Sequence, residues 1–430
     1  MRRSIITSLC FSLLFIYISC EEQSITAKSN NPAPVIGNDN GDVSGDDSDA
    51  GNENNDEEKI EKATGIYASM ISGSDTQNPI VTHAQSNGGL IRTTWNKIET
   101  SDQVFDFSSI DNQLAIIEKN NHNKPEFKFS LAISAGCGSI TSSGYPLWMD
   151  ARTDIDKWTI KFRDNTCTNM PKGWDQDYLD ELKEFAEALA LKYGKDDRLT
   201  LIYVPQTTGN GIEGHFNGNF KDRDVHDWTP LTDQGLNEET WVKAMKEASL
   251  IFADAFKNKA IAIELHEVID THIIPLKAVD EIYNDPRSEG RVGIAMWWMF
   301  GKFEHSELMA GFKNFKGDVY GQVGANSKQI GRFGGCGYDS IFDLAIDLNM
   351  RYIEPWDTEF KLAGTHGIDQ DSYNTQVENF KKFNEYVSKK FLLGEDPAKP
   401  IFTIINPTVP DPNHDPTVTG KPCPARYDES

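Results

Sequence analysis

Residues 199–220 of this sequence read Leu199-Thr-Leu-Ile-Tyr-Val204-Pro-Gln-Thr-Thr-Gly-Asn-Gly-Ile-Glu213-Gly-His-Phe-Asn-Gly-Asn-Phe220. The first six residues are mostly apolar, which is typical of a buried strand. The four glycines that follow allow backbone conformations closed to other residues and let a ligand approach closely. Loops at the carboxyl ends of barrel strands carry catalytic groups. Glu213 is therefore a candidate catalytic residue, and the alternative is a solvated glutamate on a surface loop.

The same strand pattern recurs along the chain and mostly alternates with helical patterns. We predict strands over 65–71, 89–95, 127–133, 199–204, 260–265, 292–297, 318–323 and 351–354. Helical spacing occurs over 107–119, 175–193, 238–257, 276–283, 307–315, 341–349 and 373–391. This order predicts an α/β fold, a parallel (β/α)8 TIM barrel over residues 63–395, with a doubly wound open sheet as the alternative. The first connection, 72–88, shows no clear helix.

The N-terminus has the features of a targeting segment. Two arginines precede the apolar run 5–18, which is too short for an ordinary transmembrane helix and indicates a signal peptide over 1–20. A small residue before Cys20 predicts a bacterial lipoprotein signal with lipid attached to Cys20, and plain secretion is the alternative. Residues 21–62 are polar and acidic, so we expect a disordered tether. Acidic residues directly after Cys20 resemble surface lipoproteins of the Bacteroidetes type. The expected location is the cell envelope, at the outer-membrane surface or in the periplasm, with the membrane reached through Cys20.

Composition limits the partners of the folded body. The chain has 430 residues and a net charge of −24, which argues against nucleic acid because phosphate binding needs a basic face. The mature body has four cysteines, and the sequence does not choose among their three pairings: Cys137, Cys167, Cys336 and Cys423. No His–Cys cluster suggests a metal site, and no cofactor is predicted. Residues 396–430 are expected to form an extension packed on the barrel.

Several motifs carry a resemblance to a known enzyme group. The second strand region reads Leu90-Ile-Arg-Thr-Thr-Trp-Asn-Lys-Ile-Glu99 and leads to Phe105-Asp-Phe-Ser-Ser-Ile-Asp111. Tyr145-Pro-Leu-Trp148 and Pro171-Lys-Gly-Trp-Asp175 follow. Together these resemble the clan A retaining glycoside hydrolases, in particular the family 42 β-galactosidase type, over roughly residues 65–356. The resemblance implies an O-glycosyl hydrolase that acts on an extracellular oligo- or polysaccharide.

The resemblance also assigns the general acid/base. Glycoside hydrolysis needs two carboxylates beside the scissile bond. In clan A the acid/base closes strand four after an asparagine, which places it at Glu213. Here Ile212 precedes Glu213, so the asparagine role falls to Asn210 or Asn217. As a general acid, Glu213 should have a raised pKa.

The second carboxylate departs from the family pattern. The clan's nucleophile closes strand seven, where this chain has Gln322, and an amide does not ionise. We take Glu354, at the end of strand eight, as the second carboxylate in preference to Glu267, at the end of strand five. A buried ion pair is the alternative role for Glu354. Retaining and inverting mechanisms both stay open.

Residues at the predicted strand ends suggest a carbohydrate cleft. Sugars stack their C–H faces on aromatic rings and form hydrogen bonds with polar groups. The substrate-binding candidates are Arg92, Trp95, Trp148, Gln206, His215, Asn217, His266, Glu267, Trp297, Gln322 and Trp356, with Trp298 a further aromatic. The alternative to an enzyme is a surface lipoprotein that binds carbohydrate on a degenerate glycosidase barrel.

Overall fold

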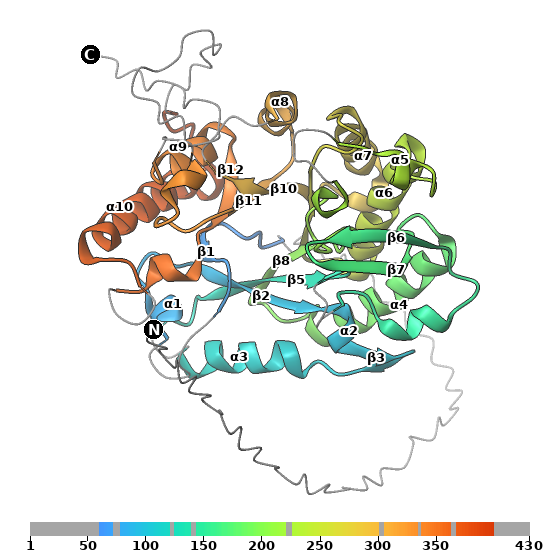
Figure 1. Ribbon diagram of the computed structural model, residues 1–430. Helices are drawn as coiled ribbons and strands as arrows, with labels where there is room; N and C mark the ends of the chain where they lie inside the picture. The colour runs from blue at the N-terminus through green and yellow to red at the C-terminus, as the bar shows by residue number, and fades with distance from the viewer. Residues whose placement is uncertain are drawn as a thin grey trace, which may run out of the picture. The chain divides into compact units, whose positions relative to one another are not determined.

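Eight parallel strands close into a barrel (Figure 1). The computed structural model describes residues 60–71, 78–120, 124–138, 143–220, 226–300, 305–333, 337–362 and 367–399. In order around the ring, the strands are β1 (Gly65–Ala68), β2 (Gly88–Thr94), β5 (Lys128–Ser134), β8 (Leu199–Tyr203), β9 (Ala260–Glu264), β10 (Val292–Met299), β11 (Val319–Val323) and β12 (Met350–Glu354). The last strand pairs with the first, with Gly65 opposite Tyr352. All eight predicted strands and the TIM barrel are confirmed, and the open sheet is wrong.

The predicted helices are confirmed, and they surround the strands on the outside (Figure 1). They are α3 (Ser108–Asn120), α4 (Gln176–Tyr193), α6 (Glu238–Ala255), α7 (Ile273–Asn284), α8 (Ser306–Asn314), α9 (Ser340–Asp347) and α10 (Gln370–Val387). Side-chain caps fix the first turn of two helices. Asp175 accepts the N–H of Tyr178 at α4, and Asn237 and Thr240 form a capping box at α6. In the first connection the structure has a single helical turn, α1 (Pro79–Thr82).

Strand residues alternate between two apolar layers. One set faces the barrel interior and includes Leu90, Tyr203, Tyr320 and Tyr352. The other set packs outward against the helices in a larger core. Because side chains alternate along a strand, every second residue continues to face the interior as far as the carboxyl ends. The interior-facing residues at those ends are Arg92, Glu264, Trp297, Gln322 and Glu354.

Two antiparallel hairpins, which the sequence analysis did not predict, follow the second and third barrel strands. One pairs β3 (Glu99–Ser101) with β4 (Val104–Phe105), and the other pairs β6 (Lys157–Phe162) with β7 (Asn165–Pro171). A disulfide between Cys137 and Cys167 ties the segment after β5 to β7. The structure thus decides a pairing that the sequence left open. Cys336 and Cys423 lie outside the described residues.

Most of the terminal predictions lie outside the described residues. These are the signal peptide with Cys20, the tether up to residue 59, and the extension from residue 400. All described residues belong to one compact unit, 57–430. Among the helices of this described part, none has the length and apolar content needed to cross a membrane.

Candidate active site

A cavity of about 660 Å³ opens at the carboxyl ends of the strands. It holds most of the predicted binding residues: Arg92, Glu213, His215, Asn217, His266, Glu267, Trp297, Trp298, Gln322 and Trp356. Residues that the sequence did not single out complete the lining, among them Phe162, Arg163, Phe220, His226, Trp228, Asp270, Phe300, His305 and Arg332. Another groove, of about 540 Å³, lies between α4 and α6 on the outside, away from the strand ends.

Asn210 organises the loop that presents Glu213. Its side-chain oxygen accepts the backbone N–H groups of Ile212 at 3.0 Å and Glu213 at 2.8 Å, and its amide donates to the Glu213 carboxylate. Such a turn is favoured at asparagine because its side chain hydrogen-bonds its own backbone two residues on. The hydroxyl of Thr208 donates to the carbonyl of Glu213 at 2.6 Å. The carboxylate is thus held in place and 22% exposed to the cavity.

Three glycines of this loop allow other segments of the chain to pack closely against its backbone. Gly211 has a φ of +87°, and a Cβ there would lie 2.0 Å from the backbone nitrogen of Gly136. A Cβ on Gly218 would meet the backbone of Lys161 at 2.6 Å, and one on Gly209 would meet the ring of Phe162 at 2.7 Å. The sequence suggested that these glycines let a ligand approach. At these three positions the structure shows a neighbouring segment of the chain instead.

Glu264 is a second carboxyl beside this loop that sequence reasoning missed. It is fully buried and accepts the N–H of Gly214 at 2.7 Å and that of Trp297 at 3.2 Å. Its Oε2 lies 2.9 Å from Nδ1 of His266, which lines the cavity. The sequence did contain an indication of Glu264. Ala260, Ala262 and Glu264 alternate along the strand and so point to the same face of it, and a single carboxyl on an otherwise apolar, buried strand is a candidate functional group.

The environments of Glu213 and Glu264 push their pKa values apart. Burial raises the pKa of Glu264 well above its usual range, and the charge of Glu213 adds to this. Burial also acts to raise the pKa of Glu213, but the hydrogen bond and charge of His215, with help from Arg92, outweigh it and lower that pKa. His215 Nε2 lies 3.6 Å from Glu213 Oε2. The raised pKa predicted for Glu213 is therefore wrong; the raised value belongs to Glu264.

The pKa values of the two neighbouring histidines shift in opposite directions. For His215, burial lowers the pKa, but the hydrogen bond and charge of Glu213 outweigh burial and raise it. Burial, and then the charge of His215, lower the pKa of His266 to about 3. The two rings lie 5.1 Å apart between centroids. At neutral pH the cavity therefore presents a neutral His266 next to an ionised Glu213.

Glu354 does not reach the cavity. It is fully buried beneath Gln322, which is its partner in the β11–β12 register. Tyr203 donates to its carboxyl at 2.9 Å, and Tyr352 and Gln322 donate as well. Burial raises its pKa to about 7. The alternative of an ion pair with an arginine inside the barrel does not hold either, because the hydrogen-bond partners are hydroxyls and an amide.

Three predicted binding residues lie elsewhere. Trp95 is fully buried, stacks on Phe185 with ring centroids 4.6 Å apart, and donates to Glu99. Trp148 packs against the outer core. Gln206 braces the loop from inside, donating to the carbonyls of Ile212 at 2.6 Å and Glu264 at 2.9 Å. These side chains shape the surroundings of the cavity and do not line it.

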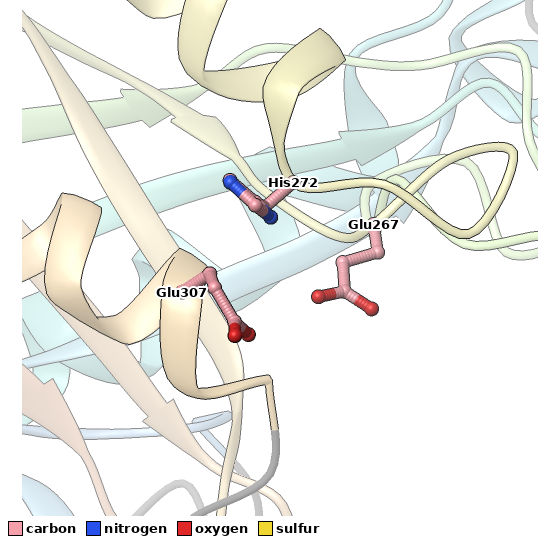
Figure 2. A group of neighbouring side chains, drawn as sticks. All are labelled: Glu267, His272 and Glu307. Carbon is pink, nitrogen blue, oxygen red and sulfur yellow. The ribbon is translucent and has the colours of Figure 1, made fainter.

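Three side chains near the cavity have donor atoms close enough to hold a metal ion. They are Glu267, His272 and Glu307, whose ligand atoms lie within 4.8 Å of one another. Figure 2 shows them around a common space between the loop after β9 and the start of α8. The group is not visible as a His–Cys cluster in the sequence, because it contains no cysteine and its members follow two different strands, β9 and β10. Two carboxylates and an imidazole suit a divalent cation.

Solved structures share the barrel. The catalytic domain of a β-amylase from Paenibacillus polymyxa has a TM-score of 0.46 at 10% identity, covering 79% of this chain and 100% of that one. A GH5_18 protein from Streptomyces cattleya in complex with Manb1-4GlcNAc has a TM-score of 0.46 at 11% identity, covering 78% and 83%. Endo-glycoceramidase II from Rhodococcus sp. has a TM-score of 0.45 at 8% identity, covering 74% and 80%.

These structural neighbours are glycoside hydrolases, and their TM-scores lie below 0.5. None of the three is named as a family 42 enzyme, so that finer resemblance stays a prediction. No protein-family model and no curated protein matches the chain.

Proposed function

We propose that this protein is a glycoside hydrolase that cleaves a glycan in the cavity at the carboxyl ends of its strands. The observation that carries the proposal is Glu213, a carboxylate held by Asn210 at a cavity lined by Trp297, Trp298 and Trp356. Aromatic faces suit the apolar faces of sugars, and a carboxylate at the same surface can act on the glycosidic bond. In this proposal the protein reaches its extracellular glycan as a lipoprotein anchored through Cys20.

The opposite pKa directions of Glu213 and Glu264 support a division of the two roles that hydrolysis needs. Glu213 is ionised and acts as the nucleophile or the general base. Glu264 is protonated and supplies the proton through His266. The neutral His266 ring gives its Nε2 proton to the departing oxygen and takes the Glu264 proton at Nδ1, so the step leaves Glu264 ionised and His266 neutral. Opposed pKa values in neighbouring acids are typical of such a division.

Substrates with different leaving groups separate these roles. Glu213→Gln and Glu264→Gln should each lower turnover of a natural glycoside by roughly 10²–10⁴-fold. An aryl glycoside with a good leaving group needs little protonation, so it should restore activity to Glu264→Gln and His266→Gln but not to Glu213→Gln. The opposite pattern would return the acid role to Glu213. Glu187→Gln, whose side chain is 59% exposed on α4, is the matched control.

A carbohydrate-binding protein without activity is the second candidate, and Gln322 favours it. This amide occupies the strand-seven end, and Glu354 beside it is buried, so neither supplies a carboxylate to the cavity. Under this candidate, wild type binds a glycan by calorimetry and releases no new reducing ends, and Glu213→Gln changes only affinity. Absence of both binding and cleavage across a broad glycan panel would overturn both candidates.

A further inference from the structure

The arginines of the described residues fall into two groups. Five are paired with carboxylates at 2.7–3.2 Å: Arg152, Arg198, Arg287, Arg291 and Arg351. Arg92, Arg163 and Arg332 have no carboxylate partner within the described ranges, and all three line the same cavity. The chain has 66 acidic residues against 42 lysines and arginines. Three of the eight described arginines therefore lack a carboxylate partner although acidic residues are in excess, and all three line one cavity.

Each of the three guanidinium groups lies on an aromatic ring. The distance from the guanidinium carbon to the ring centre is 4.8 Å for Arg92 over Trp297. It is 5.0 Å for Arg163 over Phe162 and 4.7 Å for Arg332 over Phe300. Stacking uses the flat face of the guanidinium and leaves the N–H groups at its edge available. That edge matches the geometry of a carboxylate or a sulfate.

The carboxylates of the cavity are held by histidines. Glu213 has His215 at 3.6 Å, Glu267 has His305 at 2.7 Å, and Asp270 has His226 at 2.5 Å. Among the described residues no arginine forms an ion pair with these three carboxylates, although the charge of Arg92 helps to lower the pKa of Glu213. The cavity therefore offers positive groups to a ligand in a chain whose net charge is −24.

We propose that the glycan bound in this cavity is anionic, an oligosaccharide that carries carboxylate or sulfate groups recognised by Arg92, Arg163 and Arg332. The three residues come from separate elements: β2, the turn between β6 and β7, and the segment Ile330–Phe333 after β11. A negatively charged sugar gains charge-assisted hydrogen bonds there that a neutral sugar lacks. This inference rests on the proposed function and adds the class of substrate to it.

The test compares each anionic glycan with its neutral counterpart. The probes are polygalacturonate and its carboxyl-reduced form, and chondroitin sulfate and its desulfated form. We expect the protein to bind one anionic member at least tenfold more tightly than its neutral counterpart, and to lose affinity as salt rises. The polygalacturonate pair reports on carboxylates, and the chondroitin pair on sulfates. Binding is measured on Glu213→Gln, so that cleavage does not consume the probe.

Arginine variants identify the groups responsible. Arg163→Ala and Arg332→Ala should each weaken binding of the anionic glycan by roughly ten- to a hundredfold, since a hydrogen bond to a charged group is worth that much. Binding of a neutral glycan should weaken less than binding of the anionic one. Lys183→Ala, at a side chain 63% exposed on α4, should change neither.

The outcomes separate the substrate class from the function itself. If neutral glycans bind and are cleaved as well as anionic ones, or if both arginine variants keep full affinity, the anionic substrate is wrong and the hydrolase stands. If no glycan is bound or cleaved, the proposed function fails and this inference fails with it.

Discussion

Replacing Glu354 by glutamine should change how stability depends on pH. The carboxyl is fully buried, and its pKa is raised from about 4.5 to about 7 because burial disfavours the ionised form. In the unfolded chain the same carboxyl ionises near its ordinary pKa. Glutamine has almost the same shape and cannot ionise, so the variant removes this titration from the protein.

The sign follows from proton linkage. Below pH 4.5 Glu354 is protonated in both the folded and the unfolded state, so its titration does not change the free energy of unfolding. As the pH rises towards 7, the unfolded chain releases the proton and the folded chain keeps it, so the folded state loses stability relative to the unfolded one. A difference of about 2.5 pKa units corresponds to about 3 kcal/mol, fully lost above pH 7. Wild type should therefore lose about 3 kcal/mol between pH 4 and pH 8 that Glu354→Gln does not lose.

Chemical denaturation measured from pH 4 to pH 8 tests this. The informative quantity is the difference in unfolding free energy between wild type and variant, followed as a function of pH. A pH-independent part of this difference is also expected, because Tyr203, Tyr352 and Gln322 donate to the carboxyl and an amide accepts from them less well. Glu187→Gln, at an exposed site, should follow wild type at every pH. Parallel curves for wild type and Glu354→Gln would refute the reasoning, because they would mean that Glu354 titrates normally in the folded protein.

Three further predictions concern the loop, the disulfide and the anchor. Gly211→Ala should displace the loop that carries Glu213 and lower glycan turnover at least tenfold. The strain of a left-handed backbone at a non-glycine residue should by itself lower the free energy of unfolding by about 1–2 kcal/mol. Gly331→Ala, where a Cβ meets open space, is the control for kinetics and melting. Opening the Cys137–Cys167 disulfide, by reductant or by Cys137→Ala, should cost about 3.5 kcal/mol because it closes a loop with a sequence separation of 30, and an unchanged denaturation midpoint would contradict this. Cys20→Ala should release the protein from the membrane fraction of cells, and a variant that still sediments with membranes would show that the lipoprotein interpretation is wrong.

The sequence alone determined the barrel and its main loop. Strand and helix periods are local properties, so the apolar segments such as Leu199–Tyr203 and the amphipathic helices such as Gln176–Tyr193 were found close to where the structure has them. The glycine-rich loop with one carboxylate also pointed to Glu213, which lies at the cavity. Both inferences need only the order of residues along the chain.

Only the tertiary structure decided which polar groups share the site and in what charge state. Trp95 and Glu354 stand at strand ends as Trp297 and Gln322 do, yet the first two are fully buried and the last two line the cavity. The raised pKa of Glu264 depends on burial and on Glu213, which is 51 residues away in sequence. Exposure and pKa depend on neighbours brought together by strand register and loop packing. Sequence spacing fixes the period of an element, but it does not fix which distant residues surround a side chain.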